Sequence, residues 1–389
     1  MPRKRFALAV LALAALIAVP ATTAPAATKT TKKKAPTTTK KATTATTVAA
    51  TASTGAAATT VVPASGSGDS PISLDALYAA AKKEGKVTIY TTANAVQMDP
   101  AAAGFESRYP GVKVTWSRTS TPELITKFGA EAASGVNAVD VMHLSDTLFI
   151  VDQIKQNLIV PLNKAGLPGG FPGKFPSRWL TAGGQLGMQT MSPSGFAYNT
   201  NLVKGNDIPK TYNDFIGPAW QGKIIALDPT TAGSAIWDFW DFMLETFGEQ
   251  WLTNFKDNKP IWYATAVPGA QANAAGEAPL FIPAFPSLTA SLKAGKAPIE
   301  QVVPGETTGV LFSSAPAAKA PHPNAARLFV YDLYQQPSAD TFAQIPDQVS
   351  PYGGGLGQLP QRFKLPNSVR SATPERRALI AKLLGLKYP

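Results

Sequence analysis

The feature that most constrains the fold is a strand–helix–strand pattern over residues 82–118. Two short apolar segments, 86–90 and 112–116, each follow a glycine and lead into a polar loop. Between them, Asp99-Pro100 combines a capping carboxylate with proline at the first helical position, which predicts a helix that runs to Tyr109. The pattern predicts the opening unit of a parallel α/β sheet, in which ligands bind at the carboxyl ends of the strands.

The same alternation continues along the chain, whereas residues 164–195, rich in Gly, Pro and Ser, are predicted to form loops with short pieces of structure. Capping residues and glycine stops predict the helices, and short apolar runs between them predict the strands. We therefore expect an α/β fold with mainly parallel sheets and right-handed crossovers. Further helices are expected over 73–84, 121–134, 235–247, 287–294 and 323–335, and further strands over 139–144, 224–227, 279–284, 299–303 and 309–314.

Three of the predicted strand ends carry small hydroxyl, amide or carboxylate side chains. Each set lies at or just before the start of a helix, where backbone N–H groups have no partner within the helix. Taken alone, each set is explained equally well by ordinary helix capping, but three sets along one sheet edge favour a ligand-binding edge. The candidate ligand-binding residues are Thr91, Thr92 and Asn94, then Ser120 and Thr121, then Ser145 and Asp146.

A further candidate element follows the predicted strand 224–227, where residues 228–234 open an aromatic-rich helix. The hydroxyl groups of Thr230, Thr231 and Ser234, together with the backbone amides of a helix N-terminus, are suited to hold a carboxylate or phosphoryl group. An equally weighted alternative is that Thr231 only caps the N-terminus of this helix. Apolar walls are typical of ligand sites, and the candidates for this role are Trp237 and Phe285.

The first 70 residues differ in composition from the rest of the chain. A basic start, an apolar run over 6–19 and Ala24-Pro25-Ala26 predict a signal peptide over 1–26, with an uncleaved anchor helix as the alternative. Residues 27–70, mostly Thr, Ala, Lys, Ser, Gly and Pro, are predicted to be a disordered linker, or alternatively a tether to the wall or membrane surface. The chain has no Cys, which excludes disulfides and a lipoprotein anchor.

The net charge of +11 is concentrated at the same end of the chain. Residues 1–68 hold nine Lys and Arg and no Asp or Glu, so the remaining 27 basic residues are nearly balanced by 25 acidic ones. A nucleic-acid-binding domain normally carries a clustered basic excess. The composition of the body therefore gives no reason to expect a nucleic-acid partner.

Six segments form a set with a family resemblance: Ala-Lys-Lys-Glu-Gly-Lys-Val-Thr-Ile-Tyr (81–90), Phe-Glu-Ser-Arg-Tyr-Pro-Gly-Val-Lys-Val (105–114), Val-Asp-Val-Met (139–142), Tyr-Asn-Thr-Asn-Leu-Val (198–203), Trp-Gln-Gly-Lys-Ile (220–224) and Ala-Pro-His-Pro-Asn-Ala-Ala-Arg-Leu-Phe (320–329). Each of these motifs alone is only modest evidence for a family. Together, and in this order, they resemble the extracellular solute-binding proteins of ABC importers, in the branch that contains the ferric-ion-binding proteins. The resemblance covers about residues 72–345.

The resemblance implies a two-lobed periplasmic-binding-protein type II fold over 71–389, in which two α/β lobes close on a ligand. It also implies that the chain crosses a hinge near 188–197 and near 307–316. The expected lobe one comprises about 72–190 plus 312–340, and lobe two about 191–311 plus 341–389.

Ferric-binding members of this branch use an adjacent pair of tyrosines with acidic or histidine ligands. The corresponding stretch here, 280–285, contains phenylalanine and no tyrosine. His143 lies in an apolar strand and His322 in a turn before a helix, so both are expected to be structural. Tyr90 and Tyr198 fall in strands that match framework positions of the family. The sequence therefore predicts no metal ligands and no cofactor.

The sequence predicts an exported substrate-binding component of an ABC importer, which captures a small, anionic organic solute and delivers it to a membrane permease. A ferric-ion-binding transport protein is one alternative, and a cell-surface sensory or wall-tethered binding protein is another. An enzyme is not expected, because the common catalytic motifs are absent and the chain has two His and no Cys. We expect a monomer in the periplasm or cell envelope.

Overall fold

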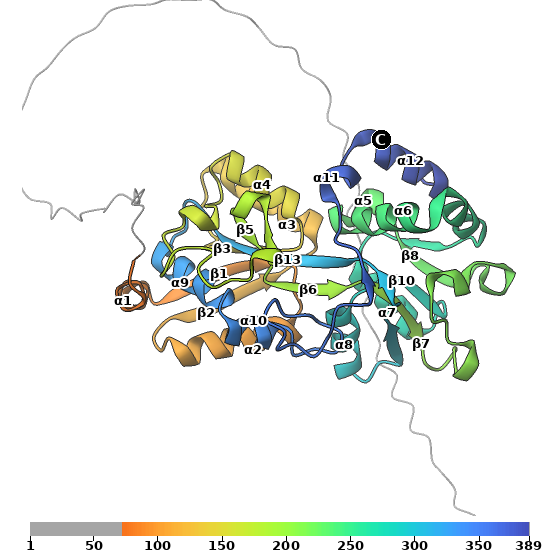
Figure 1. The fold of residues 1–389 in the computed structure, drawn as a ribbon, viewed down its shortest axis with the longest axis horizontal. Helices are drawn as coiled ribbons and strands as arrows, with labels where there is room; N and C mark the ends of the chain where they lie inside the picture. The colour runs from red at the N-terminus through yellow and green to blue at the C-terminus, as the bar shows by residue number, and fades with distance from the viewer. Residues whose placement is uncertain (1–71, 389) are drawn as a thin grey trace, which may run out of the picture. The chain divides into compact units, whose positions relative to one another are not determined.

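The computed structural model describes residues 72–388 (Figure 1). The predicted signal peptide and linker lie outside these residues. Among the helices of the described residues, none is both long and apolar enough to span a membrane. The strands of this part of the chain form two five-stranded sheets and two small two-stranded ones.

The first sheet has the strand order β2-β1-β3-β13-β6. Its three neighbouring strands β2, β1 and β3 are parallel, whereas β13 runs antiparallel to both β3 and β6. The helices that follow β1, β2 and β3 are α2, α3 and α4, and α1 packs against α9. The bounds are α1 (Leu74–Glu84), β1 (Lys86–Thr91), α2 (Ala95–Arg108), β2 (Lys113–Arg118), α3 (Thr121–Ser134), β3 (Val141–Leu144), α4 (Thr147–Lys155), β6 (Thr190–Pro193), β13 (Gly309–Pro316), α9 (Pro323–Leu333) and α10 (Gln336–Phe342).

The second sheet has the strand order β11-β7-β10-β8-β9. Strands β10, β8 and β9 are parallel, whereas β7 runs antiparallel to both of its neighbours, β10 and β11. The long helix α6 follows the short helix α5, and α12 packs against α6. The bounds are β7 (Gly195–Asn199), β8 (Ile224–Leu227), α5 (Pro229–Ala232), α6 (Ser234–Asp257), β9 (Ile261–Tyr263), α7 (Ala266–Ala275), β10 (Leu280–Ala284), α8 (Pro286–Ala294), β11 (Ile299–Val302), α11 (Ser368–Ser371) and α12 (Pro374–Leu384).

Short strands and single helical turns connect the elements of the two large sheets. The two-stranded sheets pair β4 (Leu180–Thr181) with β5 (Leu186–Gly187), and β12 (Glu306–Thr307) with β14 (Arg362–Phe363). Residues 164–195, expected to be loops with short pieces of structure, contain the short strands β4, β5 and β6. Single 3₁₀ turns lie at Leu162–Lys164, Ser177–Trp179, Ala182–Gly184, Gly205–Asp207, Tyr212–Phe215 and Pro218–Trp220.

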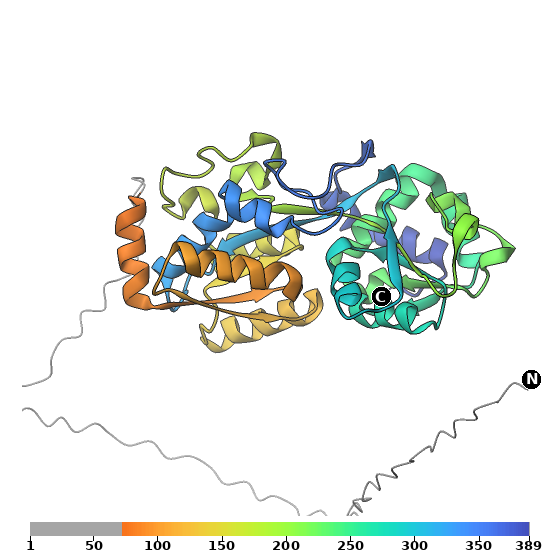
Figure 2. The same cartoon turned by 90° about the horizontal axis from the view of Figure 1, so that it is seen from below.

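Each large sheet has its own hydrophobic core, and we call each sheet with its helices a lobe, lobe one around β1 and lobe two around β8. Figures 1 and 2 show the orange and gold elements in lobe one and the green elements in lobe two. This confirms the expected α/β class and two-lobed fold. The sheets are mixed rather than uniformly parallel, because β13 and β7 return against their neighbours.

The chain passes between the lobes at several places. Only Ser194 separates β6 of lobe one from β7 of lobe two, and the chain returns between β11 and β13. A further passage follows α10: Phe342 and Val349 lie in the core of lobe one, whereas Ile380 lies in that of lobe two. Figure 2 shows this dark-blue segment running from one lobe to the other. The lobe boundaries expected from the sequence stay a prediction.

Local signals set most of the helix ends, and α3 is the clearest case. Ser120 and Glu123 form a capping box, Pro122 occupies the first turn, and Gly135 ends the helix with a left-handed φ of 74°. Each of these devices supplies partners or backbone geometry that a helix end requires. The predicted helix over 121–134 is therefore confirmed at both ends.

The start of α2 was predicted wrongly. The helix begins at Ala95 rather than after Asp99, and Pro100 lies inside it. The Asn94 carbonyl already accepts the N–H groups of Gln97 and Met98. Gln97 and Met98 are buried, and burial of this first turn outweighs the local start signal at Asp99-Pro100.

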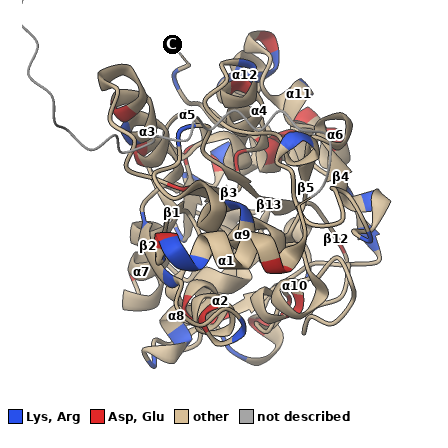
Figure 3. Ribbon diagram, turned by 90° about the vertical axis from the view of Figure 1, so that its left-hand side faces the viewer, with Lys and Arg blue, Asp and Glu red and all other residues tan. Residues whose placement is uncertain are grey.

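Charged residues are scattered with both signs over the elements of lobe one, as Figure 3 shows. Several are paired, including Arg108 with Asp332 at 2.7 Å and Lys113 with Glu106 at 2.7 Å. This distribution agrees with the nearly balanced charge of the body of the chain.

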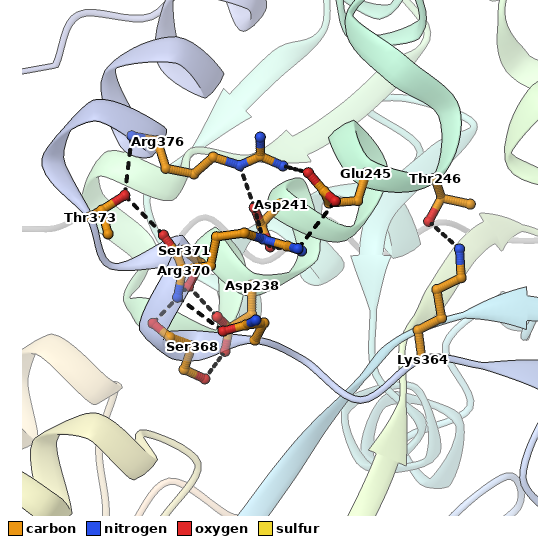
Figure 4. Close-up of polar contacts among 11 residues, drawn as sticks. Asp238, Asp241, Glu245, Thr246, Lys364, Ser368, Arg370, Ser371, Thr373 and Arg376 are labelled. Carbon is orange, nitrogen blue, oxygen red and sulfur yellow. Dashed lines mark hydrogen bonds and ion pairs between the residues drawn. The ribbon is translucent and has the colours of Figure 1, made fainter.

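The C-terminal helices are fixed to α6 of lobe two by a buried polar cluster (Figure 4). The carboxylate of Asp241, 1% exposed, accepts hydrogen bonds from Arg370 at 2.6 Å and Arg376 at 2.5 Å. One turn earlier, Asp238 accepts hydrogen bonds from the hydroxyls of Ser368 and Ser371. These contacts make residues 368–384 part of lobe two.

Candidate ligand-binding site

A cavity of about 320 Å³ is lined by residues of both lobes. This volume lies at the small end of the range typical of small-molecule sites. The polar side of the lining comes mainly from the ends of β1, β2 and β3, and the apolar side mainly from the segments that follow β8, β9 and β10. The cavity is therefore located where the loops of both sheets face each other.

Half of the residues expected at the site line this cavity. In lobe one, the carboxyl ends of the three parallel strands converge as expected for a parallel sheet, and each contributes lining side chains. In lobe two, Phe285 lines the cavity directly before α8. The expected residues that line it are Thr92, Asn94, Ser120, Thr121, Ser145 and Phe285.

Two expected residues of lobe one do not line the cavity, because their side chains serve the local backbone. Thr91 is fully buried, and its hydroxyl accepts the N–H of Ala93 at 2.9 Å. Asp146 is also buried, and its carboxylate accepts the N–H of Phe149 at 2.9 Å, which caps α4. For these two residues the helix-capping interpretation describes the contacts.

The expected group in residues 228–237 also lies outside the lining. Asp228 caps the short helix α5 and accepts the Thr230 hydroxyl at 2.7 Å, while Thr231 is exposed beside the carbonyls of Asp228 and Ala264. Ser234 starts α6, and Trp237 is buried against Tyr388. Because α5 is inserted before α6, Ala232, Ala235 and Ile236 line the cavity in place of the expected residues.

Several lining residues were missed by the sequence reasoning. Arg118 was missed because β2 continues two residues beyond the expected strand end at 116. Thr265 and Val267 were missed because α7 is rich in Ala and Gly and carries no recognised start signal. The polar residues missed are Arg118, Thr119, Glu123, Ser192, Thr265 and Ser287, and the apolar ones include Leu227, Val267, Pro268, Leu288, Val310 and Phe312.

Arg118, the last residue of β2, is the lining residue with a positive charge in the described part of the chain. No hydrogen bond or ion pair of its guanidinium is found among residues 72–388. Although the side chain is exposed, the protein atoms around it exclude enough water to lower its pKa, and the nearby Glu123 charge partly opposes this shift. Its charge is thus available to a ligand.

Glu123 is the acidic lining residue, and one of its two carboxylate oxygens is already engaged. One carboxylate oxygen accepts the hydroxyls of Thr119 at 2.5 Å and Ser120 at 2.8 Å, and the Ser120 N–H at 3.1 Å. The Thr119 hydroxyl is the main cause of its lowered pKa, followed by the Ser120 hydroxyl and N–H. Glu123 therefore acts as the ionised partner of the α3 capping box.

Thr92 supplies a hydroxyl group with no partner among the described residues, although that oxygen is shielded from solvent. An unpaired buried hydroxyl costs stability, so a ligand atom at this position would be a favourable acceptor. Nearby, the Asn94 side chain donates a hydrogen bond to Ser287 Oγ at 3.2 Å, which joins lobe one to lobe two at the cavity.

Within residues 72–388, first-turn or capping residues of five helices line the cavity. Helix N-termini carry unpaired N–H groups and partial positive charge, so they favour anions. Lobe one contributes α2 and α3, and lobe two contributes α6, α7 and α8. Each of these helices has at least nine residues, which gives it a substantial dipole.

The chemistry of the lining does not suit a transition metal. Among the described residues, no group of three or more His, Cys, Asp or Glu is placed to hold an ion. His143 is buried, contacts Ser314 Oγ at 2.7 Å and stacks on Phe312, and burial lowers its pKa to about 3. His322 Nδ1 lies 3.0 Å from Asp140. Tyr90 donates to Glu131 at 3.0 Å.

Comparisons with solved structures agree with the two-lobed fold. The substrate-binding protein of an ABC transporter from Agrobacterium tumefaciens superposes with a TM-score of 0.65, at 17% identity over 77% of this chain and 93% of that one. AfuA from Actinobacillus pleuropneumoniae, with fructose-6-phosphate bound, gives 0.60 at 20% identity over 78% and 98%. Iron-bound HitA from Pseudomonas aeruginosa gives 0.55 at 16% identity over 77% and 99%.

These identities are low, so the superpositions establish the fold and leave the ligand open. No protein with a curated description matches the sequence. A family model described as bacterial extracellular solute-binding protein matches residues 90–332, which is more than half of the chain and includes β2, β13 and all the residues that line the cavity. Proteins of this family bind solutes rather than transform them. The chain therefore belongs to the bacterial extracellular solute-binding protein family.

Proposed function

We propose that this protein is the exported binding component of an ABC importer and that it captures a small organic anion in the cavity between its lobes. It acts as a monomer in the periplasm or cell envelope and delivers the solute to a membrane permease. The observation that carries the choice of an anion is Arg118, whose guanidinium lines the cavity without a partner in residues 72–388.

The surroundings of Arg118 support the same choice. Five helix N-termini add partial positive charge around the cavity, and Thr92 adds an unpaired hydroxyl. One carboxylate oxygen of the acidic lining residue, Glu123, accepts hydrogen bonds from Thr119 and Ser120. An anion at Arg118 would recover the charge-assisted hydrogen bonds that this guanidinium lacks.

The ferric-ion alternative has less support. Fe(III) is a hard cation that needs several anionic oxygen ligands, and the lining offers one carboxylate and no tyrosine or histidine in the described residues. Arg118 and the helix N-termini would also repel a cation.

The test is a thermal-unfolding assay of the full chain with acetate, phenylacetate, succinate, fructose 6-phosphate, putrescine and Fe(III), the last against its chelator alone. A bound anion at 100 times its Kd stabilises the folded state by about 2.7 kcal/mol, which is a measurable rise in Tm. We expect one or more organic anions to raise Tm and putrescine to leave it unchanged. A rise with Fe(III) or putrescine and with none of the anions would overturn the proposal.

A further inference from the structure

The two walls of the cavity differ in chemistry, and this difference narrows the class of ligand. We propose that the ligand is a monocarboxylate with a compact apolar body, a short aliphatic or aryl group, whose carboxylate contacts lobe one and whose body contacts lobe two. This inference rests on the proposed function, because it assumes that the cavity holds an organic anion.

The wall formed by lobe one is suited to the carboxylate. The side chains of Arg118, Thr92 and Ser145 come from the ends of the three parallel strands, so they approach the cavity from one sheet edge. In the described residues, none of these three side chains has a hydrogen-bond partner in the protein. A carboxylate has two oxygens that accept several hydrogen bonds, which matches this set of free donors.

The wall formed by lobe two is apolar. Leu227, Ile236 and Leu288 are at most 6% exposed, and they contribute to the lining from β8, α6 and α8. Val267 and Phe285 complete this surface, and Phe285 packs against the cores of both lobes. Within the described part of the chain, no charged side chain of lobe two lines the cavity.

The polar groups of the lobe-two wall are few. Ser287 is buried and accepts the hydrogen bond of Asn94, which leaves its hydroxyl free to donate, and Thr265 offers the other lining hydroxyl of lobe two. A sugar phosphate or dicarboxylate would bury polar groups against this wall with few partners, which is unfavourable. Apart from these hydroxyls, the donors that lobe two brings to the cavity are the backbone N–H groups at the starts of α6, α7 and α8.

Lobe one also contributes apolar lining residues. Val310 and Phe312, on β13, line the cavity and are each at most 8% exposed. Phe312 is held by the ring of His143 behind it, at 5.3 Å between centroids. An apolar body placed on lobe two thus contacts hydrophobic atoms on two sides.

Isothermal titration of the full chain tests this division with acetate, butyrate, hexanoate and phenylacetate, against succinate, fructose 6-phosphate and sulfate. Each buried CH₂ is expected to raise the affinity about fourfold, so hexanoate should bind on the order of 100-fold more tightly than acetate until the cavity is filled. Phenylacetate should also exceed acetate, and the three hydrophilic anions should bind more weakly than hexanoate.

Two variants separate the walls. Val267→Ser should weaken hexanoate about tenfold and leave acetate unchanged, because it removes apolar surface from lobe two only. The matched control is Val369→Ser, at a valine of lobe two that is 74% exposed and outside the lining; it should change neither affinity. Val267→Ala, which retains an apolar side chain, should give an intermediate loss for hexanoate and checks that the effect comes from apolar contact.

The outcomes distinguish this inference from the proposed function. If succinate, fructose 6-phosphate or sulfate binds more tightly than every monocarboxylate, the apolar class of ligand is wrong while the anion site stands. Equal hexanoate affinity in wild type and Val267→Ser also overturns the inference. If no organic anion binds, the proposed function fails and the inference fails with it.

Discussion

The two lobes have similar architecture and different chemistry at the cavity. Each is a five-stranded mixed sheet in which parallel strand–helix units bring helix N-termini to one edge. In lobe one the lining residues at and after the strand ends include Arg118 and several hydroxyls, whereas in lobe two they include Leu227 at the end of β8, Ile236 in α6 and Val267 in α7. The comparison shows that this fold determines where a ligand binds. Which ligand binds depends on a few side chains that follow each strand.

The two lobes also differ in the pKa shift of a buried ionisable group, which is His143 in lobe one and Asp238 in lobe two. In lobe one, His143 lies in β3 with no exposed surface, and burial keeps it neutral. In lobe two, Asp238 lies in α6 at 7% exposure, and burial is the main cause that raises its pKa to about 6, although Ser371 and Ser368 oppose the shift. The two groups should therefore respond to pH in opposite directions.

The largest expected effect is the acid sensitivity caused by His143. Its pKa is about 3 in the folded state and about 6.5 in the unfolded state, so the unfolded state binds more protons between these values. Stability should fall by a few kcal/mol as pH drops from about 6.5 toward 3. His143→Gln should remove most of this fall, measured by urea unfolding at several pH values. A variant as acid-sensitive as wild type would show that His143 is not the cause.

The next effect has the opposite sign and belongs to Asp238. Its pKa is about 6 when folded, against an ordinary value of 3.8 for an exposed aspartate, so the folded state binds more protons in this window. Stability should decrease by roughly 2–3 kcal/mol as pH rises from about 4 to 6 and then level off. Asp238→Asn, which still offers an acceptor and a donor to the two serines, should flatten this part of the profile. An unchanged slope in the variant would contradict the assignment.

The third prediction concerns the wall of lobe one. Arg118→Gln should weaken binding of an organic anion by about 2 kcal/mol, roughly 30-fold, because a charge-assisted hydrogen bond is lost. Calorimetric titration with hexanoate measures the change. The matched control is Lys113→Gln, at the other end of β2 and outside the lining, which should bind as wild type does. Equal losses in both variants would point to general electrostatics rather than to contact.

The smallest effect should separate binding from stability. Thr92→Val removes a shielded hydroxyl that has no partner in residues 72–388, so the free energy of unfolding without ligand should stay equal or rise by up to about 1 kcal/mol. Hexanoate affinity should fall several-fold at the same time. A loss of stability without any loss of affinity would show that this hydroxyl serves the fold rather than the ligand.

The sequence predicted lobe one better than lobe two. Proline, glycine and capping residues mark α3 at both ends, and the hydroxyls after β1, β2 and β3 follow directly from the rule on strand ends. Arg118 was missed because strand length depends on pairing: β2 stays paired with β1 as far as Thr91 opposite Arg118. Local composition does not contain that information.

In lobe two, the turn and helix signals were found in the right order along the chain. The positions of the side chains relative to the cavity were not predicted from them. Residues 228–234 were expected to form a turn that opens a single helix, but Asp228 caps the separate helix α5, and Thr230 and Thr231 do not line the cavity. Trp237 was expected to line the cavity as an apolar wall, yet it is buried beside Tyr388 from the C-terminal region. Contacts between residues so distant in sequence cannot be inferred from a local pattern.

The ion pairs that fix α12 and α11 to α6 also constrain the order of folding. Asp241 and Arg370 are 129 residues apart, and in lobe one His143 and Ser314 are 171 residues apart. Because a chain is synthesised from its N-terminus, neither lobe can complete its core until most of the sequence has emerged. Closing such long loops also slows folding. Both lobes therefore reach their final form only late in synthesis.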